Sequence, residues 1–407
     1  MKILHVLPYL QSAGTERHVL ALSQALVARG HGVRLLSPDG PLRQAFVEAN
    51  IPHLEFPAFR GWPVPTLRAI LLGIQRALEW GVDVIHVHAG VELLFAVQWA
   101  LGQCGLGRPG SPAALLSAPA VVFTVHSYFS RRPELDYWLA ARLGARWADR
   151  TIAVSYADAA RLMRCAPKLE GRLRVVHNGT SDVPPPPAAE VEAFRQSLRE
   201  NHGAAPSAPI CLVVARLTAQ KGIDLLLDAL ILYQGVPFLT VVAGDGPLRA
   251  ELEERARRLG LDFKSASPDR PRIAFLGPRD DVRRLLAAAD LLVLPSRMEG
   301  LSLALVEAHA AGVPCLVTRV GGNEEIVADG ETGVIVPPED PAALAGALGR
   351  LLSDPAERWA MGEAARRRYE AHFTVERMAE ATCALYQEAL ASKRCAAGKV
   401  LSDYGGR

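Results

Sequence analysis

Two glutamates stand close together in a stretch that otherwise has the composition of a buried core. Residues 295–314 read PSRMEGLSLALVEAHAAGVP, and the two acids are Glu299 and Glu307. If both were helical they would lie about 12 Å apart along the axis, too far for their carboxyl groups to share a proton. The pair therefore suits a ligand that spans it. The alternative is that both acids are solvated and bind nothing.

The local sequence predicts how these acids are presented. LLVLP reads as a strand, and a helix should begin at Ser302 and end near Gly312, because glycine and then proline stop a helix. Glu299 would lie in the loop ahead of the helix and Glu307 more than a turn inside it. Amides at a helix start favour an anion, and here they belong to Gly300, Leu301, Ser302 and Leu303. A nucleotide sugar fits, with Glu307 on the ribose, the diphosphate on the amides and Glu299 on the sugar.

Other residues could act on the same kind of ligand. Arg216 and Lys221 bracket a turn after a strand, where two cations can neutralise a diphosphate; the alternative is a pair of surface cations. His126 ends an apolar strand and is either a site residue or a core histidine. Gly14 would let a backbone approach the diphosphate. Glu325 either binds the donor or caps a helix.

No metal site is expected from the spacing of these residues. The sequence has no Asp-x-Asp motif, which leaves the diphosphate to Arg216, Lys221 and helix amides. Its six cysteines show no close pairing and no metal-ligand spacing, which indicates a reduced cytoplasmic chain without disulfides or zinc.

The elements that must position these residues follow a repeated strand and helix rhythm. Short apolar runs such as KILHVL, DVIHVH and AVVFTVH alternate with longer amphipathic stretches, and the rhythm begins again at residue 207. This pattern predicts α/β architecture with two doubly wound, Rossmann-like domains whose strand ends face a cleft. Pro184–Pro187 reads as a stiff linker. We expect domains at residues 1–182 and 183–375, with 376–407 forming a terminal helix that crosses back to the first domain, plus a tail.

Charge is unevenly distributed between the two halves. Residues 1–180 carry 19 Lys and Arg against 12 Asp and Glu, whereas the remaining residues carry 26 against 31. The first half therefore favours an anionic partner such as a lipid headgroup or a phosphorylated acceptor, unless its arginines are simply solvated. No apolar run is long enough to span a bilayer, so any membrane contact would be peripheral, on its inner face.

The segment EGLSLALVE resembles the E-x7-E element of retaining glycosyltransferases with the GT-B fold, of the glycosyltransferase family 4 type. The resemblance extends over nearly the whole chain through SAGTERHVLALSQALVARGHGV, FTVH, HNGTSD, VARLTAQKGIDLLLDAL, VVAGDGPLRAEL, VGGNEEIV and GETGVIVPP, in the family's order. It departs in having one glycine, Gly14, where the family usually has two, and in placing Asp182 one residue late.

The resemblance implies a metal-independent, retaining hexosyltransferase in polysaccharide or glycolipid biosynthesis. Its substrate would be a UDP- or GDP-linked sugar, with no other cofactor, and its acceptor a carbohydrate or a lipid-linked glycan. His126 would contact the donor sugar; Arg216, Lys221 and Gly14 would bind the diphosphate. The alternatives are a nucleotide-sugar epimerase on the same fold and a non-catalytic nucleotide-sugar-binding protein. A nicotinamide oxidoreductase lacks its G-x-G-x-x-G motif, and no nucleic-acid partner is expected.

Aromatic and cationic residues suggest where an acceptor or a membrane would bind. They occur in AFRGWPVP and in HSYFSRRPELDYWLAARLGARW. Arg131 and Arg132 lie beside Tyr128 and Phe129, ahead of an amphipathic run at 135–147. Such a patch would be attracted to anionic lipids. The alternative is an ordinary helix whose tryptophans pack into the core.

Overall fold

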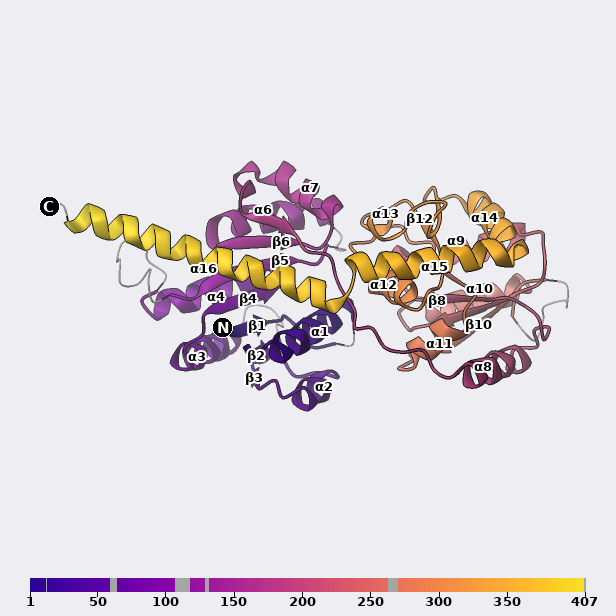
Figure 1. Ribbon diagram of the computed structural model, residues 1–407, viewed down its shortest axis with the longest axis horizontal. Helices are drawn as coiled ribbons and strands as arrows, with labels where there is room; N and C mark the ends of the chain where they lie inside the picture. The colour runs from indigo at the N-terminus through magenta and orange to yellow at the C-terminus, as the bar shows by residue number, and fades with distance from the viewer. Residues whose placement is uncertain (12, 59–63, 107–117, 129–131, 263–269, 406–407) are drawn as a thin grey trace. The chain divides into compact units, whose positions relative to one another are not determined.

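The computed structural model describes residues 1–405 apart from 12, 59–63, 107–117, 129–131 and 263–269 (Figure 1). The chain divides into two compact units. Met1–Ser181 and Val375–Arg407 form unit 1, and Asp182–Thr374 form unit 2. Each unit has a parallel sheet with helices packed on its faces, which confirms the expected α/β class and the two Rossmann-like folds.

The sheet of unit 1 has seven strands in the order β3-β2-β1-β4-β5-β6-β7. These are β1 (Lys2–Val6), β2 (Gly32–Ser37), β3 (His53–Glu55), β4 (Val84–His88), β5 (Ala120–Val125), β6 (Arg150–Ala153) and β7 (Leu173–Val175). The chain order reverses between β1 and β4. In open α/β sheets, ligands bind outside the carboxyl ends of strands at such a reversal.

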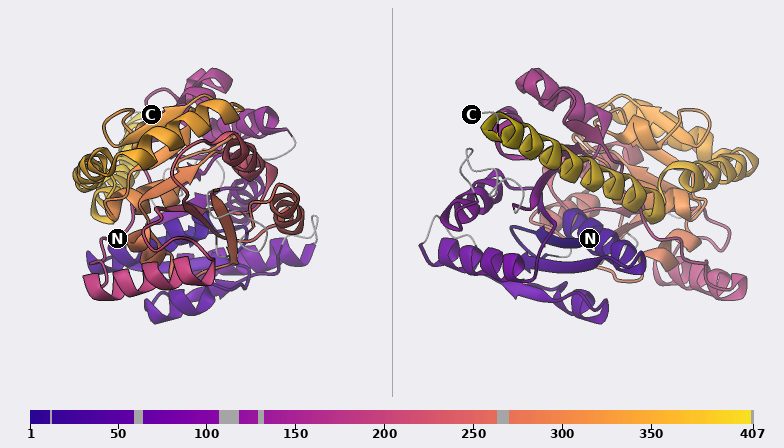
Figure 2. Two further views of the ribbon diagram at one scale, coloured as in Figure 1. Left: turned by 90° about the vertical axis from the view of Figure 1, so that its right-hand side faces the viewer. Right: turned by 60° about the vertical axis from the view of Figure 1, so that its left-hand side comes forward.

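Helices cover both faces of this sheet. One face is covered by α1 (Gly14–Ala28), α2 (Arg43–Glu48) and α16 (Val375–Gly405), and α1 and α16 lie side by side (Figure 2). The other face is covered by α3 (Val64–Glu79), α4 (Val91–Gln103), α6 (Pro133–Trp147) and α7 (Tyr156–Cys165), with a short 3-10 turn at Pro167–Leu169.

Strand β4 shows how the sequence builds this arrangement. Its five residues VIHVH are all buried, as expected for a central strand covered on both sides. Side chains alternate between faces, so Ile85 and Val87 join the core under α3 and α4, whereas Val84 joins the core under α1 and α16. His86 and His88 share the face of Val84.

Unit 2 repeats this organisation with six strands in the order β10-β9-β8-β11-β12-β13. The strands are β8 (Ile210–Val214), β9 (Leu239–Ala243), β10 (Arg272–Gly277), β11 (Leu291–Leu294), β12 (Cys315–Thr318) and β13 (Gly333–Val336). Its helices are α8 (Ala188–Asn201), α9 (Ile223–Leu232), α10 (Arg249–Arg258), α11 (Val282–Ala288), α12 (Leu303–Ala310), α13 (Asn323–Ile326), α14 (Pro341–Ser353) and α15 (Pro355–His372).

Three helices, α14, α15 and α16, follow one another from residue 341 onward, and the first two begin at local signals. Asp340 and Asp354 each cap a helix through a side-chain oxygen, and each is followed by a proline at the first helical position. The last helix continues to Gly405, through residues that we expected to form a tail. Among the described residues no helix combines the length and the apolar character needed to cross a bilayer.

Candidate functional site

Loops at the carboxyl ends of β8 and β11 bring two of the predicted site residues together. Lys221 closes a short turn after β8, and Glu299 lies in the loop between β11 and α12. The Lys221 ammonium donates to both carboxylate oxygens of Glu299, at 2.7 and 2.9 Å. The Ser296 hydroxyl donates to Oε1 of the same acid at 2.6 Å. The side chain of Glu299 is 4% exposed, so this carboxylate is a buried, paired group.

Two glycines allow the surrounding loops to pack this closely. Gly222 follows the lysine with φ 64°, and a Cβ there would lie 2.0 Å from the carbonyl oxygen of Pro295. Gly321 has φ 53°, and its Cβ would lie 1.8 Å from the carbonyl oxygen of Glu299. Any other residue would be strained by its backbone and would clash with backbone atoms. The glycines therefore fix the positions from which Lys221 and Glu299 meet.

Arg297 braces the same loops and was not anticipated from the sequence. Its guanidinium donates to both oxygens of Asp224 at 2.7 and 2.8 Å, to Glu339, and to the carbonyl oxygen of Ala219 at 2.8 Å. Hydrogen bonding to Arg297 lowers the pKa of Asp224, and the carboxylates raise the pKa of Arg297. The cluster ties the turn that carries Lys221 to the loop that carries Glu299.

Helix α12 starts where the sequence places a ligand anion. Ser302 is extended and acts as N-cap, Leu303 is the first helical residue, and the Val306 amide donates to the Ser302 carbonyl at 3.2 Å. The first amides of a helix have no partner inside it. Glu307 is half-buried and lies one turn further on. Gly300 and Leu301 complete the approach to the helix, and both are buried.

The other two predicted residues of unit 2, Arg216 and Glu325, lie on other segments. Arg216 is exposed, two residues beyond the end of β8. Glu325 is half-buried in the short helix α13, and its carbonyl oxygen accepts from Arg368 at 2.8 Å. Asp182, which departs from the family spacing, pairs with Arg366 through two bonds of 2.8 and 2.6 Å.

Two predicted site residues belong to unit 1. Gly14 is the first residue of α1, and His126 directly follows β5. The structure places four more histidines around His126, which sequence reasoning missed: His5 on β1, His18 on α1, and His86 and His88 on β4. Burial lowers the pKa of each of the five, to about 3 for His5 and about 4 for His18.

The chain is similar to known families over both halves. Residues 12–182 match the family described as Glycosyltransferase Family 4, and residues 194–368 match Glycosyl transferases group 1. The alpha-D-kanosaminyltransferase of Streptomyces kanamyceticus is 32% identical over 202 residues, 49% of this chain and 50% of that protein. The N-acetyl-alpha-D-glucosaminyl L-malate synthase of Bacillus anthracis is 24% identical over 91% of this chain and 92% of its own length.

Solved structures show the same fold. Anabaena Alr3699/HepE in complex with UDP-glucose has a TM-score of 0.78 and 22% identity, covering 96% of this chain and 100% of that chain. WaaG, a glycosyltransferase involved in lipopolysaccharide biosynthesis, has a TM-score of 0.65 and 20% identity, covering 93% and 98%.

The chain therefore has the GT-B fold, and nearly all of it resembles the glycosyltransferases of the family 4 type, as the sequence motifs predicted. It spans about half the length of some of its curated relatives, such as the kanosaminyltransferase and the D-inositol 3-phosphate glycosyltransferase of Corynebacterium urealyticum.

Proposed function

We propose that this protein is a retaining glycosyltransferase that moves a hexose-type sugar from a UDP- or GDP-linked donor to a glycan or a lipid-linked acceptor. The observation that carries the proposal is the buried Lys221–Glu299 pair beside the start of α12. It sets a cation, a carboxylate and helix amides at one end of a parallel sheet. The family models on both halves and the UDP-glucose complex of a structural neighbour support the same reading.

The donor diphosphate is assigned to the cations and amides of unit 2. Lys221 supplies a positive charge that is already oriented by Glu299, and Arg216 supplies a second, exposed one. Residues Gly300, Leu301, Ser302 and Leu303 lead into a helix N-terminus that favours an anion. Glu325, in the short helix α13, is assigned to the same donor. Gly14 is assigned to the diphosphate by family resemblance alone.

The two glutamates are assigned to the hydroxyl groups of the donor. Glu307 accepts from the ribose. Glu299 already accepts two bonds from Lys221 and one from Ser296, and a carboxylate has about four lone-pair sites, so it keeps capacity for a hydroxyl of the transferred sugar. His126 is assigned to the sugar by resemblance.

Transfer with retention needs no carboxylate nucleophile. The bond from the anomeric carbon to the phosphate oxygen breaks while the acceptor oxygen forms its bond on the same face. The departing phosphate oxygen takes the acceptor proton. Negative charge grows on that phosphate, and Arg216 and Lys221 stabilise it without a bound metal. Addition of a chelator should therefore leave turnover unchanged. Activity that disappears with the chelator and returns with magnesium would assign this role to a metal.

A screen of nucleotide sugars tests the proposal. We expect one UDP- or GDP-sugar to raise the melting temperature of the protein and to be consumed when an acceptor is added. The anomeric configuration of the product is then read by NMR and should match that of the donor. Conversion of the donor sugar into its isomer without transfer would identify the epimerase alternative. Binding without any turnover would identify a non-catalytic sugar-nucleotide-binding protein.

We also propose that unit 1, which would bind the acceptor, contacts an anionic membrane through helix α6. Helix α6 leaves Leu135 46% and Trp138 44% exposed, and the guanidinium of Arg142 lies 5.2 Å from the centre of the Trp138 ring. Trp147, by contrast, packs against the core. The neighbouring Phe129, Arg131 and the AFRGWPVP positions 59–63 lie outside the described residues. An aromatic ring beside a cation suits the headgroup region of a bilayer.

Vesicle flotation tests the membrane proposal. At low salt the protein should float with anionic vesicles and not with neutral ones, and salt should weaken the binding. Trp138→Ala with Arg142→Ala should reduce recovery. A variant with Trp359→Ala, which removes a 71% exposed tryptophan of unit 2, is the matched control. Equal recovery with both kinds of vesicle would point to an acceptor free in solution.

A further inference from the structure

The carboxyl end of the unit 1 sheet carries histidines where the same face otherwise carries aliphatic residues. On the face covered by α1 and α16, the strands begin with Ile3, Val84 and Ala120, which pack in one apolar core. Further along the strands, this face carries His5, His86 and His88. His5 lies opposite His86 in the register of β1 and β4. A buried imidazole destabilises the fold unless its ring nitrogens have hydrogen-bond partners.

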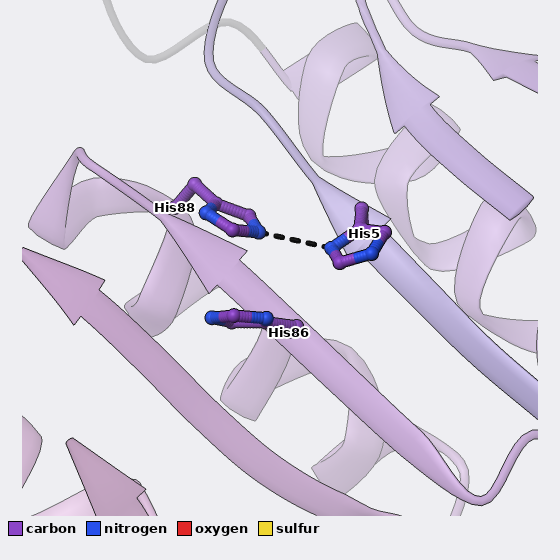
Figure 3. A group of neighbouring side chains, drawn as sticks. All are labelled: His5, His86 and His88. Carbon is purple, nitrogen blue, oxygen red and sulfur yellow. Dashed lines mark hydrogen bonds between the residues drawn. The ribbon is translucent and has the colours of Figure 1, made fainter. Parts of the chain in front are cut away.

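Three of the imidazoles are joined end to end. Nδ1 of His5 and Nε2 of His88 are 2.9 Å apart, and Figure 3 shows this bond across the gap between β1 and β4. Nδ1 of His88 and Nε2 of His126 are 3.1 Å apart. His88 thus uses both ring nitrogens, one toward each neighbour, and the three rings form a chain from the interior of the sheet to the loop after β5.

The rings of this chain are neutral at ordinary pH. His5 and His88 are fully buried, and burial is the main reason why the pKa values of His5, His88 and His126 are lowered. A neutral imidazole has one N–H donor and one acceptor nitrogen. The tautomers in the chain are therefore linked. If one ring carries its proton on Nδ1, both neighbours must do the same, and the alternative is that all three carry it on Nε2.

The inner end of the chain favours the first of these two states. Nε2 of His5 is buried and has no hydrogen-bond partner. With protons on Nε2 throughout, His5 would bury an N–H group with no acceptor, and orphaned buried N–H groups are rare in proteins. With protons on Nδ1, His5 leaves only a lone pair unmatched. His126 then accepts from His88 through Nε2, and its Nδ1–H group has no hydrogen-bond partner among the described residues.

We propose that the imidazoles of His5, His88 and His126 form one chain that holds His126 as the Nδ1–H tautomer in a fixed orientation. His88 and His5 are then positioning residues, and His126 presents a hydrogen-bond donor to an oxygen of a sugar hydroxyl. The chain of imidazoles is inferred from the geometry of unit 1 alone, whereas the assignment of a sugar as the ligand of His126 rests on the proposed function.

Neighbouring residues hold the chain in place. The ring of His86 lies 3.9 Å from that of His88, centre to centre, and its nitrogens bond to the hydroxyls of Tyr386 and Thr124, both at 2.6 Å. Tyr386 is fully buried and comes from α16. The ring of His18 meets His126 edge-on at 4.8 Å. The C-terminal helix thus supports the histidines through the bond between Tyr386 and His86. Because a hydroxyl group can donate or accept, Tyr386 and Thr124 can bond to His86 in either of its tautomers.

A metal ion is the rival occupant of this cluster. Two sets, His5 with His86 and His88, and His18 with His88 and His126, each place one nitrogen per residue within 4.8 Å of the others. Zinc bound by three imidazoles needs each Zn–N distance near about 2.0–2.1 Å. Both nitrogens of His86 and of His88 already have hydrogen-bond partners, so either set would have to break at least one of these bonds. The hydrogen-bonded chain needs no such change.

Nitrogen-15 NMR of the full-length protein, labelled at histidine, tests the proposal directly. His309 in unit 2 is an internal reference, because its Nδ1 faces the carbonyl oxygen of Leu305 at 3.1 Å and must carry the proton. We expect His5, His88 and His126 to show the same tautomer as His309. Different tautomers within the three, or a shared Nε2–H form, would overturn the assignment.

Variants at His88 test whether the chain positions His126. In His88→Ala, His126 should become a mixture of tautomers while His309 is unchanged. In His88→Asn, whose amide can still donate toward Nε2 of His126, the Nδ1–H form should be largely restored. If His126 keeps one tautomer in His88→Ala, the chain does not position it. One equivalent of zinc should leave the five signals unshifted. Stoichiometric binding that shifts them and is lost in His88→Ala would replace the chain by a metal site.

Kinetics connect the chain to transfer. Once a donor is identified, His88→Ala should lower kcat about tenfold with little change in the donor KM, as expected for an interaction that matters most in the transition state, and His88→Asn should recover most of the loss. An unchanged kcat in His88→Ala would show that the tautomer of His126 does not serve transfer. The NMR experiment needs neither donor nor acceptor. Failure of the proposed function can therefore be distinguished from failure of the tautomer assignment.

Discussion

The two sheets of this protein carry different kinds of side chain at the carboxyl ends of equivalent strands. In unit 1, strands β1 and β4 carry the buried imidazoles of His5, His86 and His88, and β5 leads into the half-buried His126; burial keeps these rings neutral. In unit 2, the equivalent strands β8, β11 and β12 lead into a charged lysine, a buried carboxylate and paired glycines. The same topology thus carries two kinds of site. We call the histidines at the carboxyl ends of the unit 1 strands the neutral edge, and the charged loops at the carboxyl ends of the unit 2 strands the ionic edge. Neutral donors suit sugar hydroxyls, and ionic groups suit a diphosphate.

The difference also shows how each edge avoids unpaired buried groups. Unit 2 matches the charges of Lys221 and Glu299 and braces their loops through Arg297. Unit 1 contains no such charge match among these histidines, so burial keeps them neutral and they pair with one another. Removing one partner should therefore leave an unpaired buried charge in unit 2 but only an unpaired neutral ring in unit 1.

The largest effect is expected on removing the cation of the ionic edge. Lys221→Ala leaves Glu299 buried without its charge partner, which typically costs about 3–5 kcal/mol in the free energy of unfolding. Turnover should fall by about a hundredfold or more, because the charge that we propose to meet the departing phosphate is lost. Urea unfolding and steady-state kinetics measure the two effects.

A matched control and a second variant separate stability from catalysis. Arg255→Ala removes a cation from a half-exposed pair with Asp228, and it should change stability by less than about 1 kcal/mol. Combining Lys221→Ala with Glu299→Gln removes the stranded charge and should recover part of the stability but none of the activity. Recovered activity in the double variant would contradict the diphosphate role of Lys221.

The neutral edge should be the part of the molecule most sensitive to acid. The folded-state pKa values of His5 and His18 are about 3 and 4, below the ordinary value of 6.5. The unfolded chain binds protons first as pH falls, so stability is present above pH 6.5 and is lost below it. At pH 5 each group lowers the free energy of unfolding by about 2 kcal/mol.

Hydrogen exchange locates this loss. Between pH 7.5 and pH 5, after correction for intrinsic exchange rates, the amides of β1 and β4 should lose more protection than those of β8 and β11. Among its described residues, unit 2 has two histidines whose pKa is lowered by burial, the buried His309, at about 4, and the half-buried His202. Unit 2 should therefore weaken by less rather than not at all. His18→Gln should reduce the acid sensitivity of unit 1 by about 2 kcal/mol. Equal loss of protection in both units would contradict the greater acid sensitivity of unit 1.

Much of the ionic edge could be predicted because its signals are local. The strand LLVLP, the glycine and proline stops and the spacing of the acids place Glu299 in a loop and Glu307 in a helix, as the structure shows. The bond between Lys221 and Glu299 joins residues 78 positions apart, and no local pattern reveals it. Arg297 also escaped notice, since its partners Asp224 and Glu339 lie on separate segments.

The neutral edge was harder to predict for the same physical reason. Two alternating histidines are visible in VIHVH, and their period of two places both on one face of β4. Their meaning depends on His5, His18 and His126, which come from three other segments and meet only when the sheet forms. Strand β3 was also missed, because its three residues, HLE, show no alternating apolar pattern.

The smallest effect is expected at Glu307, which should act in binding rather than in chemistry. A carboxylate that accepts from ribose hydroxyls makes the same contact in the ground state and in the transition state, so Glu307→Ala should weaken donor binding and leave kcat nearly unchanged. A hydrogen bond to a charged group is worth about 1.5–3 kcal/mol, which corresponds to roughly tenfold to a hundredfold in affinity.

The control variant is Glu363→Ala, which removes an exposed acid on α15 and should leave the affinity for the donor unchanged. Calorimetric titration with the identified nucleotide sugar, and with the corresponding deoxyribose analogue, measures the contact. The analogue should bind the parent more weakly than the natural donor but bind Glu307→Ala about equally well. If Glu307→Ala instead lowered kcat strongly at an unchanged donor KM, the acid would belong to the charge-stabilising part of the ionic edge together with Lys221, and the division of labour within unit 2 would have to be redrawn.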